Sequence, residues 1–205
     1  MIKRDVQLPK NESTFLFGPR LTGKSTCIEM QYPDAVKFNL LEEDLFIQFT
    51  TDPGLFRKLC LDHHERTGAT RFVIDEVQRL PYLLNEVHSL IEKYKFTFIL
   101  SGSSARKLKR AGANLLAGRA FENFLFPLTY TEIIGHGRPF KLDDVLQFGS
   151  LPKVHLAKEE NKKLILRSYV NTYLAEEIQQ EGGVRNLPAF VRFLALAAES
   201  NTQEL

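Results

Sequence analysis

The sequence has 205 residues, of which 43% are hydrophobic and 25% charged, as in a globular chain with one sizeable core and a small second lobe. Its net charge of +2 favours no class of partner, so only local charge clusters could indicate nucleic acid. Two cysteines at positions without metal-ligand spacing, no hydrophobic signal region and no apolar run near the roughly 20 residues of a membrane span predict a cytoplasmic protein without a membrane partner.

Short apolar runs predict the strands of a parallel sheet. Four of them are rich in β-branched and aromatic residues and lack period-2 alternation, as strands buried on both faces do. They span residues 15–17, 36–41, 71–74 and 96–100, and a fifth strand is expected over 121–125. Helical patterns lie between them over 24–31, over 43–61 with a break at Pro53-Gly54, and over 81–94. The alternation predicts an α/β fold, a parallel sheet of about five strands flanked by helices with right-handed crossovers.

The pattern of alternating strands and helices ends near residue 127. Prolines and glycines punctuate the next 25 residues, and two strongly helical stretches follow, over 159–180 and 187–200. We therefore expect an α/β core over residues 1–127 and a smaller, mainly helical lobe over residues 128–205.

A glycine-bounded loop follows the first predicted strand. Residues 18–25 read GPRLTGKS and fit the phosphate-loop pattern G-x-x-x-x-G-K-[ST]. Between a strand and a helix, the backbone N–H groups of such a loop and the partial positive charge of the helix N-terminus hold phosphate. Lys24 would reach the β- and γ-phosphates, and Ser25 would offer its hydroxyl to Mg²⁺. The residues predicted to bind the triphosphate are Gly18, Pro19, Arg20, Leu21, Thr22, Gly23, Lys24, Ser25 and Thr26.

Two carboxylates end the third predicted strand. Asp75 suits coordination of Mg²⁺ beside Ser25, and Glu76 suits a general base that polarises a water for attack on the γ-phosphate. The alternative is an ordinary acidic turn that caps the following helix.

Small polar residues end the fourth predicted strand. Because the carboxyl ends of parallel strands meet at one edge of the sheet, Ser101 or Ser103 could contact the γ-phosphate or the attacking water. The alternative is a helix cap, which Ser104 could supply for the residues from Ala105 onward.

These elements resemble the AAA+ ATPases, and more closely an uncharacterised prokaryotic AAA-type group that carries a C-terminal domain of unknown function. The resemblance rests on the segments IKRD, GPRLTGKST, FVIDEVQRLP, ILSGSSARKL, LLAGRAFENFLFPLTYTE, GSLPKV and YLAEEI. It implies a P-loop NTPase sheet that binds ATP with Mg²⁺, with Lys24 and Ser25 as ligands, Asp75 for the metal and Glu76 as the catalytic acidic residue.

The resemblance also points to Arg119 in LLAGRAF. In such enzymes an arginine after the sensing strand stabilises transition-state charge, in cis or on a neighbouring subunit. The alternative is a solvated turn residue. Chains of the group are longer, and residues 187–205 look like the opening of the C-terminal domain. Either the sequence is a piece of a longer chain or the natural chain lacks that domain.

Two functions remain open from the sequence. The first is an ATPase that couples ATP binding and hydrolysis to conformational change, with a homo-oligomer as a further expectation. The second is a nucleotide-switched DNA-binding module with little turnover, which would contact DNA through a C-terminal domain or through the basic run Arg106–Arg110. That run is also typical of a solvated helix face.

Overall fold

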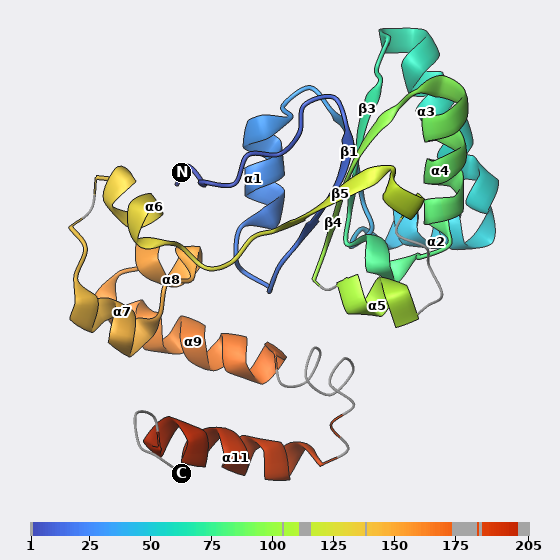
Figure 1. Cartoon of the computed structure of the whole chain (residues 1–205). Helices are drawn as coiled ribbons and strands as arrows, with labels where there is room; N and C mark the ends of the chain where they lie inside the picture. The colour runs from blue at the N-terminus through green and yellow to red at the C-terminus, as the bar shows by residue number, and fades with distance from the viewer. Residues whose placement is uncertain are drawn as a thin grey trace. The chain divides into compact units, whose positions relative to one another are not determined.

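Five parallel strands form a single sheet in the first part of the chain (Figure 1). The structure is a computed structural model that describes residues 2–103, 105–110, 116–137, 139–173, 184 and 186–200. The strands are β1 (Ser13–Phe17), β2 (Val36–Asn39), β3 (Arg71–Asp75), β4 (Thr97–Gly102) and β5 (Ala120–Phe124). Their order is β2-β3-β4-β1-β5, and all four pairings are parallel. The predicted α/β fold with a five-stranded parallel sheet is confirmed.

Burial along the strands follows their place in the sheet. The central strand β1 is buried at every position, and β4 is buried at all positions but its first. The edge strand β2 is buried only at Phe38, with Lys37 exposed, so the expectation of burial on both faces is wrong there. An edge strand has a neighbour on one side only, which leaves more of its surface in contact with water.

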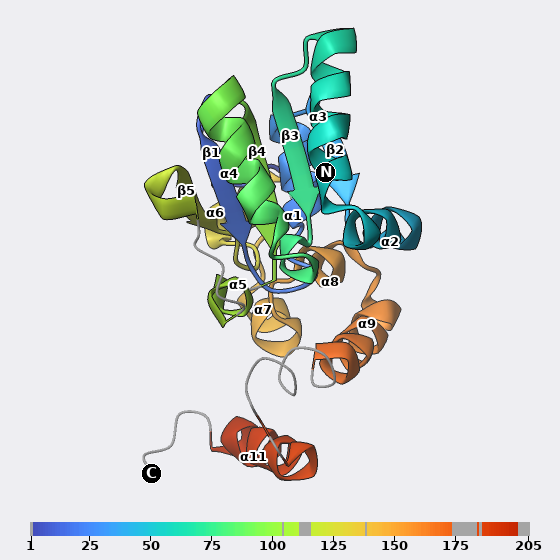
Figure 2. The same cartoon turned by 90° about the vertical axis from the view of Figure 1, so that its right-hand side faces the viewer.

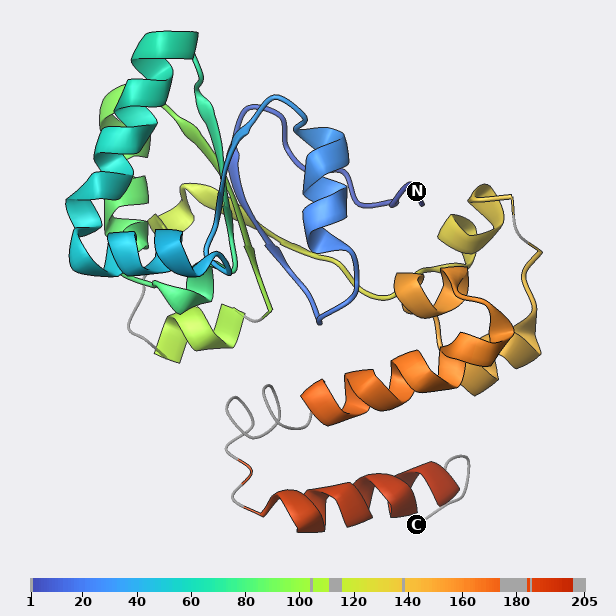
Figure 3. The ribbon, with the colours of Figure 1, turned by 180° about the vertical axis from the view of Figure 1, so that it is seen from behind.

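Helices cover both faces of the sheet. On one face lie α1 (Lys24–Gln31) and the N-terminal segment (Figure 3). They pack in a cluster that includes Leu8, Leu16 and Ile28. On the other face lie α2 (Glu43–Thr51), α3 (Pro53–Thr67) and α4 (Leu83–Tyr94) (Figure 2). These three helices pack around a larger, phenylalanine-rich cluster. The two cysteines, Cys27 and Cys60, are free and buried, one in each cluster.

The helix boundaries differ in two places from the sequence pattern. The predicted break at Pro53-Gly54 is present, because Asp52 ends α2 and its side chain accepts a hydrogen bond from Gly54 N at the start of α3, but α3 continues to Thr67 instead of ending at residue 61. The predicted helix over 81–94 begins two residues later, since a short 3₁₀ helix η1 (Val77–Arg79) precedes it.

The remaining helices divide between two compact units, residues 1–156 and 157–205. The first unit also contains α5 (Ala105–Arg110), η2 (Leu116–Gly118), α6 (Tyr130–Gly135), α7 (Leu142–Phe148) and α8 (Pro152–Leu156). The second contains α9 (Glu159–Tyr173) and α11 (Leu187–Glu199); the rest of the predicted helix over 159–180 lies outside the described residues. The domain boundary at residue 127 stays a prediction. Within the described part of the chain, no helix combines the length and apolarity that crossing a membrane requires.

Candidate nucleotide site

The phosphate loop leaves the carboxyl end of β1, between β4 and β5. Gly18 N donates to Gly102 O at 3.3 Å, and Leu125 N donates to Phe17 O at 2.7 Å, so the strands on both sides hold the start of the loop. A Cβ atom at Gly18 would overlap the carbonyl oxygen of Leu125, which explains the glycine there. At the other end, Gly23 has φ +87° and is the N-cap of α1. The predicted strand-loop-helix arrangement is present.

The lysine of the loop folds back over it. Lys24 Nζ donates to Gly18 O at 2.7 Å and to Pro19 O at 3.1 Å, and the residue is 7% exposed. The Thr22 hydroxyl donates to Pro19 O at 2.8 Å, so the loop is also closed internally. The ammonium group is thus already held inside the turn where a phosphate would need a counter-charge.

A cavity of about 340 Å³ opens at this loop. That volume is in the range of small-ligand sites. The residues that line it are Arg20, Leu21, Gly23, Lys24, Ser25, Thr26, Leu41 and Glu76. The fold therefore brings Glu76, from the carboxyl end of β3, to the same cavity as the loop, as the sequence predicts.

Asp75 links the loop to two strands. Its Oδ2 accepts a hydrogen bond from Ser25 Oγ at 2.7 Å, and its Oδ1 accepts from Ser101 Oγ and, at 3.1 Å, from Glu76 N. Hydroxyl and carboxylate oxygens are the ligands that Mg²⁺ prefers. The chemistry of this donor set fits the predicted magnesium site, with Ser25 and Asp75 as the residues that would hold the ion.

Glu76 and Ser103 are joined by a residue that the sequence analysis missed. Gln78 Nε2 donates one hydrogen bond to Glu76 Oε2 and a second, at 3.4 Å, to Ser103 Oγ. Glu76 itself has φ +59°, an unusual backbone conformation for a non-glycine residue, and is the N-cap of η1. Gln78 follows the acidic pair in DEVQ, but its role depends on the turn that η1 makes after β3.

The structure does not bring Arg119 to the loop of its own chain. Arg119 precedes β5, whose first residue, Ala120, pairs with Ser13 at the amino end of β1. The phosphate loop begins at the other end of β1, four strand residues away, which is about 13 Å. Arg119 Nε donates instead to Glu92 near the end of α4. The hydrogen bond and positive charge of Arg119 lower the pKa of Glu92.

The basic run lies on α5, directly after β4. Arg106 lines a second cavity, of about 440 Å³, with Pro19 and Phe126. The side chains of Lys107, Lys109 and Arg110 lie outside the described residues, as does Ser104 with its predicted capping role. Contact of the run with DNA therefore stays a prediction.

Comparison with known proteins finds two matching domain families and two uncharacterised relatives. The chain matches an AAA domain family over residues 10–134 and a domain of unknown function over residues 139–205. It is 28% identical over 203 residues to an uncharacterised protein of Haemophilus influenzae, covering 87% of this chain and 50% of that protein. It is 22% identical over 214 residues to an uncharacterised protein of Methanocaldococcus jannaschii, covering 91% of this chain and 47% of that protein. The chain thus spans about half the length of these relatives.

Among solved structures, the chain is similar to a Walker-type ATPase of Pyrococcus abyssi. The TM-score is 0.52 at 14% sequence identity, and the likeness covers 84% of this chain and 70% of the other. At this identity the likeness shows a shared fold, the P-loop NTPase fold. The family match covers more than half of the chain and includes the phosphate loop and both carboxylates. The chain belongs to the AAA domain family of P-loop ATPases.

Proposed function

We propose that this chain binds ATP with Mg²⁺ at the loop of residues 18–26 and hydrolyses it, and that binding and hydrolysis drive a conformational change. One observation carries the proposal. Residues of the phosphate loop and Glu76 line one cavity of about 340 Å³, and Ser25, which also lines it, donates a hydrogen bond to Asp75. The loop and Ser25 follow the carboxyl end of β1, Asp75 and Glu76 lie at the carboxyl end of β3, and ligand crevices of parallel α/β sheets lie at that end of the strands.

Each residue has a distinct part in the proposed reaction. Lys24 would balance the charge of the phosphates, and the loop N–H groups would hold their oxygens. Ser25 and Asp75 would hold Mg²⁺, and Ser101 fixes the Asp75 carboxylate by its hydrogen bond. Bound there, the ion would neutralise charge that develops on the phosphates. Glu76 would orient the attacking water and accept its proton, and Ser103 would contact the γ-phosphate or that water.

The other expectations remain part of the proposal. A homo-oligomer, a DNA partner and a cytoplasmic location are supported only by sequence features. A nucleotide-switched DNA-binding module would show a mobility shift with DNA that depends on ATP and needs no hydrolysis. An ATPase whose work does not involve DNA would show turnover without such a shift.

Binding is tested by the effect of ATP and Mg²⁺ on thermal stability. A ligand that binds only the folded state stabilises it by mass action, by about 2.7 kcal/mol at a concentration of 100 Kd. We expect ATP with Mg²⁺ to raise the Tm of the wild-type chain and Lys24→Ala to lose most of that rise. Lys58→Ala is the matched control, because Lys58 is an exposed lysine on α3. An equal rise in Lys24→Ala and the wild type would refute the assignment of the loop.

A further inference from the structure

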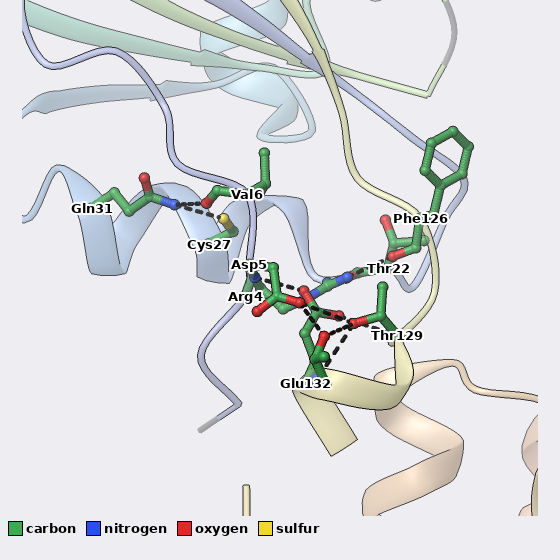
Figure 4. A network of polar contacts seen from close by, with 10 residues as sticks. Arg4, Asp5, Val6, Thr22, Cys27, Gln31, Phe126, Thr129 and Glu132 are labelled. Atoms are coloured by element: carbon green, nitrogen blue, oxygen red, sulfur yellow. Dashed lines mark hydrogen bonds and ion pairs between the residues drawn. The ribbon is translucent and has the colours of Figure 1, made fainter. Parts of the chain in front are cut away.

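Arg4 lies behind the phosphate loop and makes three buried or part-buried polar contacts (Figure 4). One guanidinium nitrogen, Nη1, donates to the carbonyl oxygen of Thr22 at 2.5 Å. The second terminal nitrogen donates to Phe126 O at 2.6 Å, and Nε donates to Glu132 Oε1 at 2.9 Å. A single side chain thus joins the loop, the segment after β5 and α6. Arg4 precedes the residues that match the AAA domain, which begin at residue 10.

The contact with Thr22 bears on the phosphate-binding surface of the loop. The peptide between Thr22 and Gly23 is trans, so its carbonyl and its N–H point in opposite directions. Arg4 holds the Thr22 carbonyl on one side, and the Gly23 N–H is thereby turned away from Arg4. Gly23 lines the cavity of the candidate nucleotide site. Gly23 has φ +87°, and glycine adopts positive and negative φ with similar ease, so the hydrogen bond from Arg4 restricts a peptide whose own residue restricts it little.

Glu132 in turn holds Arg4. The two side chains are 6% and 3% exposed, so this is a buried ion pair. Glu132 also accepts from Asp5 N at 2.7 Å and from Thr129 N at 3.0 Å, the latter as part of the capping box of α6. With these bonds the carboxylate is almost fully satisfied, and its direction is fixed. The position of the guanidinium is therefore set, and its charge is balanced, by a residue 128 positions away.

We propose that Arg4, held by Glu132, is a positioning residue of the nucleotide site: it fixes the Thr22–Gly23 peptide so that the Gly23 N–H is directed to bind phosphate. The inference rests on the proposed nucleotide binding and assigns a role within it. Arg4 touches no reacting atom. Its contribution is to the affinity of the site, since a preorganised donor costs less free energy to engage than one that must first be turned.

Lysine in place of Arg4 separates positioning from charge. Arg4→Lys keeps the positive charge and most of the stem, but one ammonium group cannot reach three acceptors in the geometry of the guanidinium fork. We expect the Kd for a fluorescent ATP analogue to rise roughly tenfold or more, as for the loss of one charge-assisted hydrogen bond. Glu132→Gln is expected to raise the Kd in the same direction. In Arg4→Ala, millimolar guanidinium should restore part of the affinity.

The experiment uses the full chain, with folding checked by circular dichroism well below the Tm. Arg66→Lys is the matched control, because Arg66 is an exposed arginine on α3, and its Kd should equal that of the wild type. Lys24→Ala serves as the reference for lost binding and should not respond to guanidinium. If the wild type itself fails to bind, the proposed function falls, and this inference with it. If the wild type binds, Lys24→Ala does not and folded Arg4→Lys binds like the wild type, the positioning role alone is overturned.

Discussion

At the carboxyl end of β3, two adjacent carboxylates lie in different surroundings. Asp75 accepts hydrogen bonds from two serine hydroxyls, one on α1 and one on β4. Glu76 lines the cavity, and its side chain accepts a hydrogen bond from the amide of Gln78. The first environment fixes the Asp75 carboxylate between α1 and β4, and the second leaves the Glu76 carboxylate at the cavity wall. We infer different roles for the two residues from this difference.

Amide substitutions test the two roles separately. Glu76→Gln keeps the shape of the side chain but cannot accept a proton, so ATP binding should persist while turnover falls by roughly 10²-fold or more. Asp75→Asn should instead weaken the part of ATP binding that depends on Mg²⁺, because an amide oxygen is a poorer ligand than a carboxylate. Phosphate release and ATP binding with and without Mg²⁺ are the measurements.

ATP binding by the two variants can be measured without turnover, so the assignment of Asp75 to the metal site is tested independently of hydrolysis. Normal turnover in Glu76→Gln would place the general base elsewhere. Unchanged dependence of binding on Mg²⁺ in Asp75→Asn would remove Asp75 from the metal site.

The loop residues could be predicted from the sequence because their chemistry depends on local spacing. The glycines and the lysine lie within nine residues of one another, and the strand and helix on either side are local patterns. Arg4 was part of the segment IKRD but had no predicted role. Its partners Thr22 and Glu132 are 18 and 128 positions away, and only the folded chain brings them together.

Among the elements, α6 combines a helix cap with a long-range ion pair. Thr129 and Glu132 form its capping box, in which each side chain bonds the backbone of the other. Glu132 Oε1 meanwhile accepts from Arg4 and from Asp5 N. The start of α6 is therefore tied to the N-terminal segment, and through Arg4 to the phosphate loop.

The titration of Glu132 predicts a pH dependence of stability. Burial raises its pKa, but the hydrogen bonds from Arg4, Asp5 N and Thr129 N outweigh it and hold the pKa below its ordinary value of 4.5. A lowered pKa in the folded state contributes stability above pH 4.5 that is lost as the pH falls through the folded-state value. Breaking a buried pair costs about 3–5 kcal/mol, so we expect Glu132→Gln to be less stable than the wild type by that order at pH 7.

Urea unfolding at pH 7 and at several values below 4.5 measures this difference. The gap between wild type and Glu132→Gln should shrink toward low pH, because glutamine does not titrate. Glu12→Gln, at an exposed glutamate, is the control and should show little difference at any pH. A gap that stays constant with pH would mean that the Glu132 charge does not contribute to stability.

The elements themselves follow closely from local pattern, and their limits do not. All five strands and α1 lie where apolar runs and the loop predict them. The turn at η1 is different, since it requires Glu76 at φ +59°, which no apolar period announces. The first residue of α4 shifts for the same reason. The position of Gln78 between Glu76 and Ser103 is a consequence of that turn.

At the scale of the whole molecule, the predicted catalytic residues lie at opposite ends of the parallel strands. The loop, Asp75 and Glu76 lie at the carboxyl edge, whereas Arg119 lies at the amino edge, paired with Glu92. The sequence predicts that strands alternate with helices but not the order β2-β3-β4-β1-β5, and the place of Arg119 depends on that order and register. A role for Arg119 in its own active site is not supported by this placement. A role in the site of a neighbouring copy stays a prediction.

That role predicts that activity depends on assembly. An arginine that acts on a neighbour stabilises mainly the transition state, so Arg119→Ala should cut turnover by roughly 10³-fold while ATP affinity barely changes. Turnover per subunit of the wild type should rise with protein concentration. Mixing Arg119→Ala with Glu76→Gln subunits should restore some activity, since a mixed interface can pair an intact Glu76 with an intact Arg119.

Arg66→Ala, at an exposed arginine paired with Asp62, is the control for loss of a surface ion pair. If Arg119→Ala keeps turnover within about twofold of the wild type, the predicted catalytic role of Arg119 is refuted.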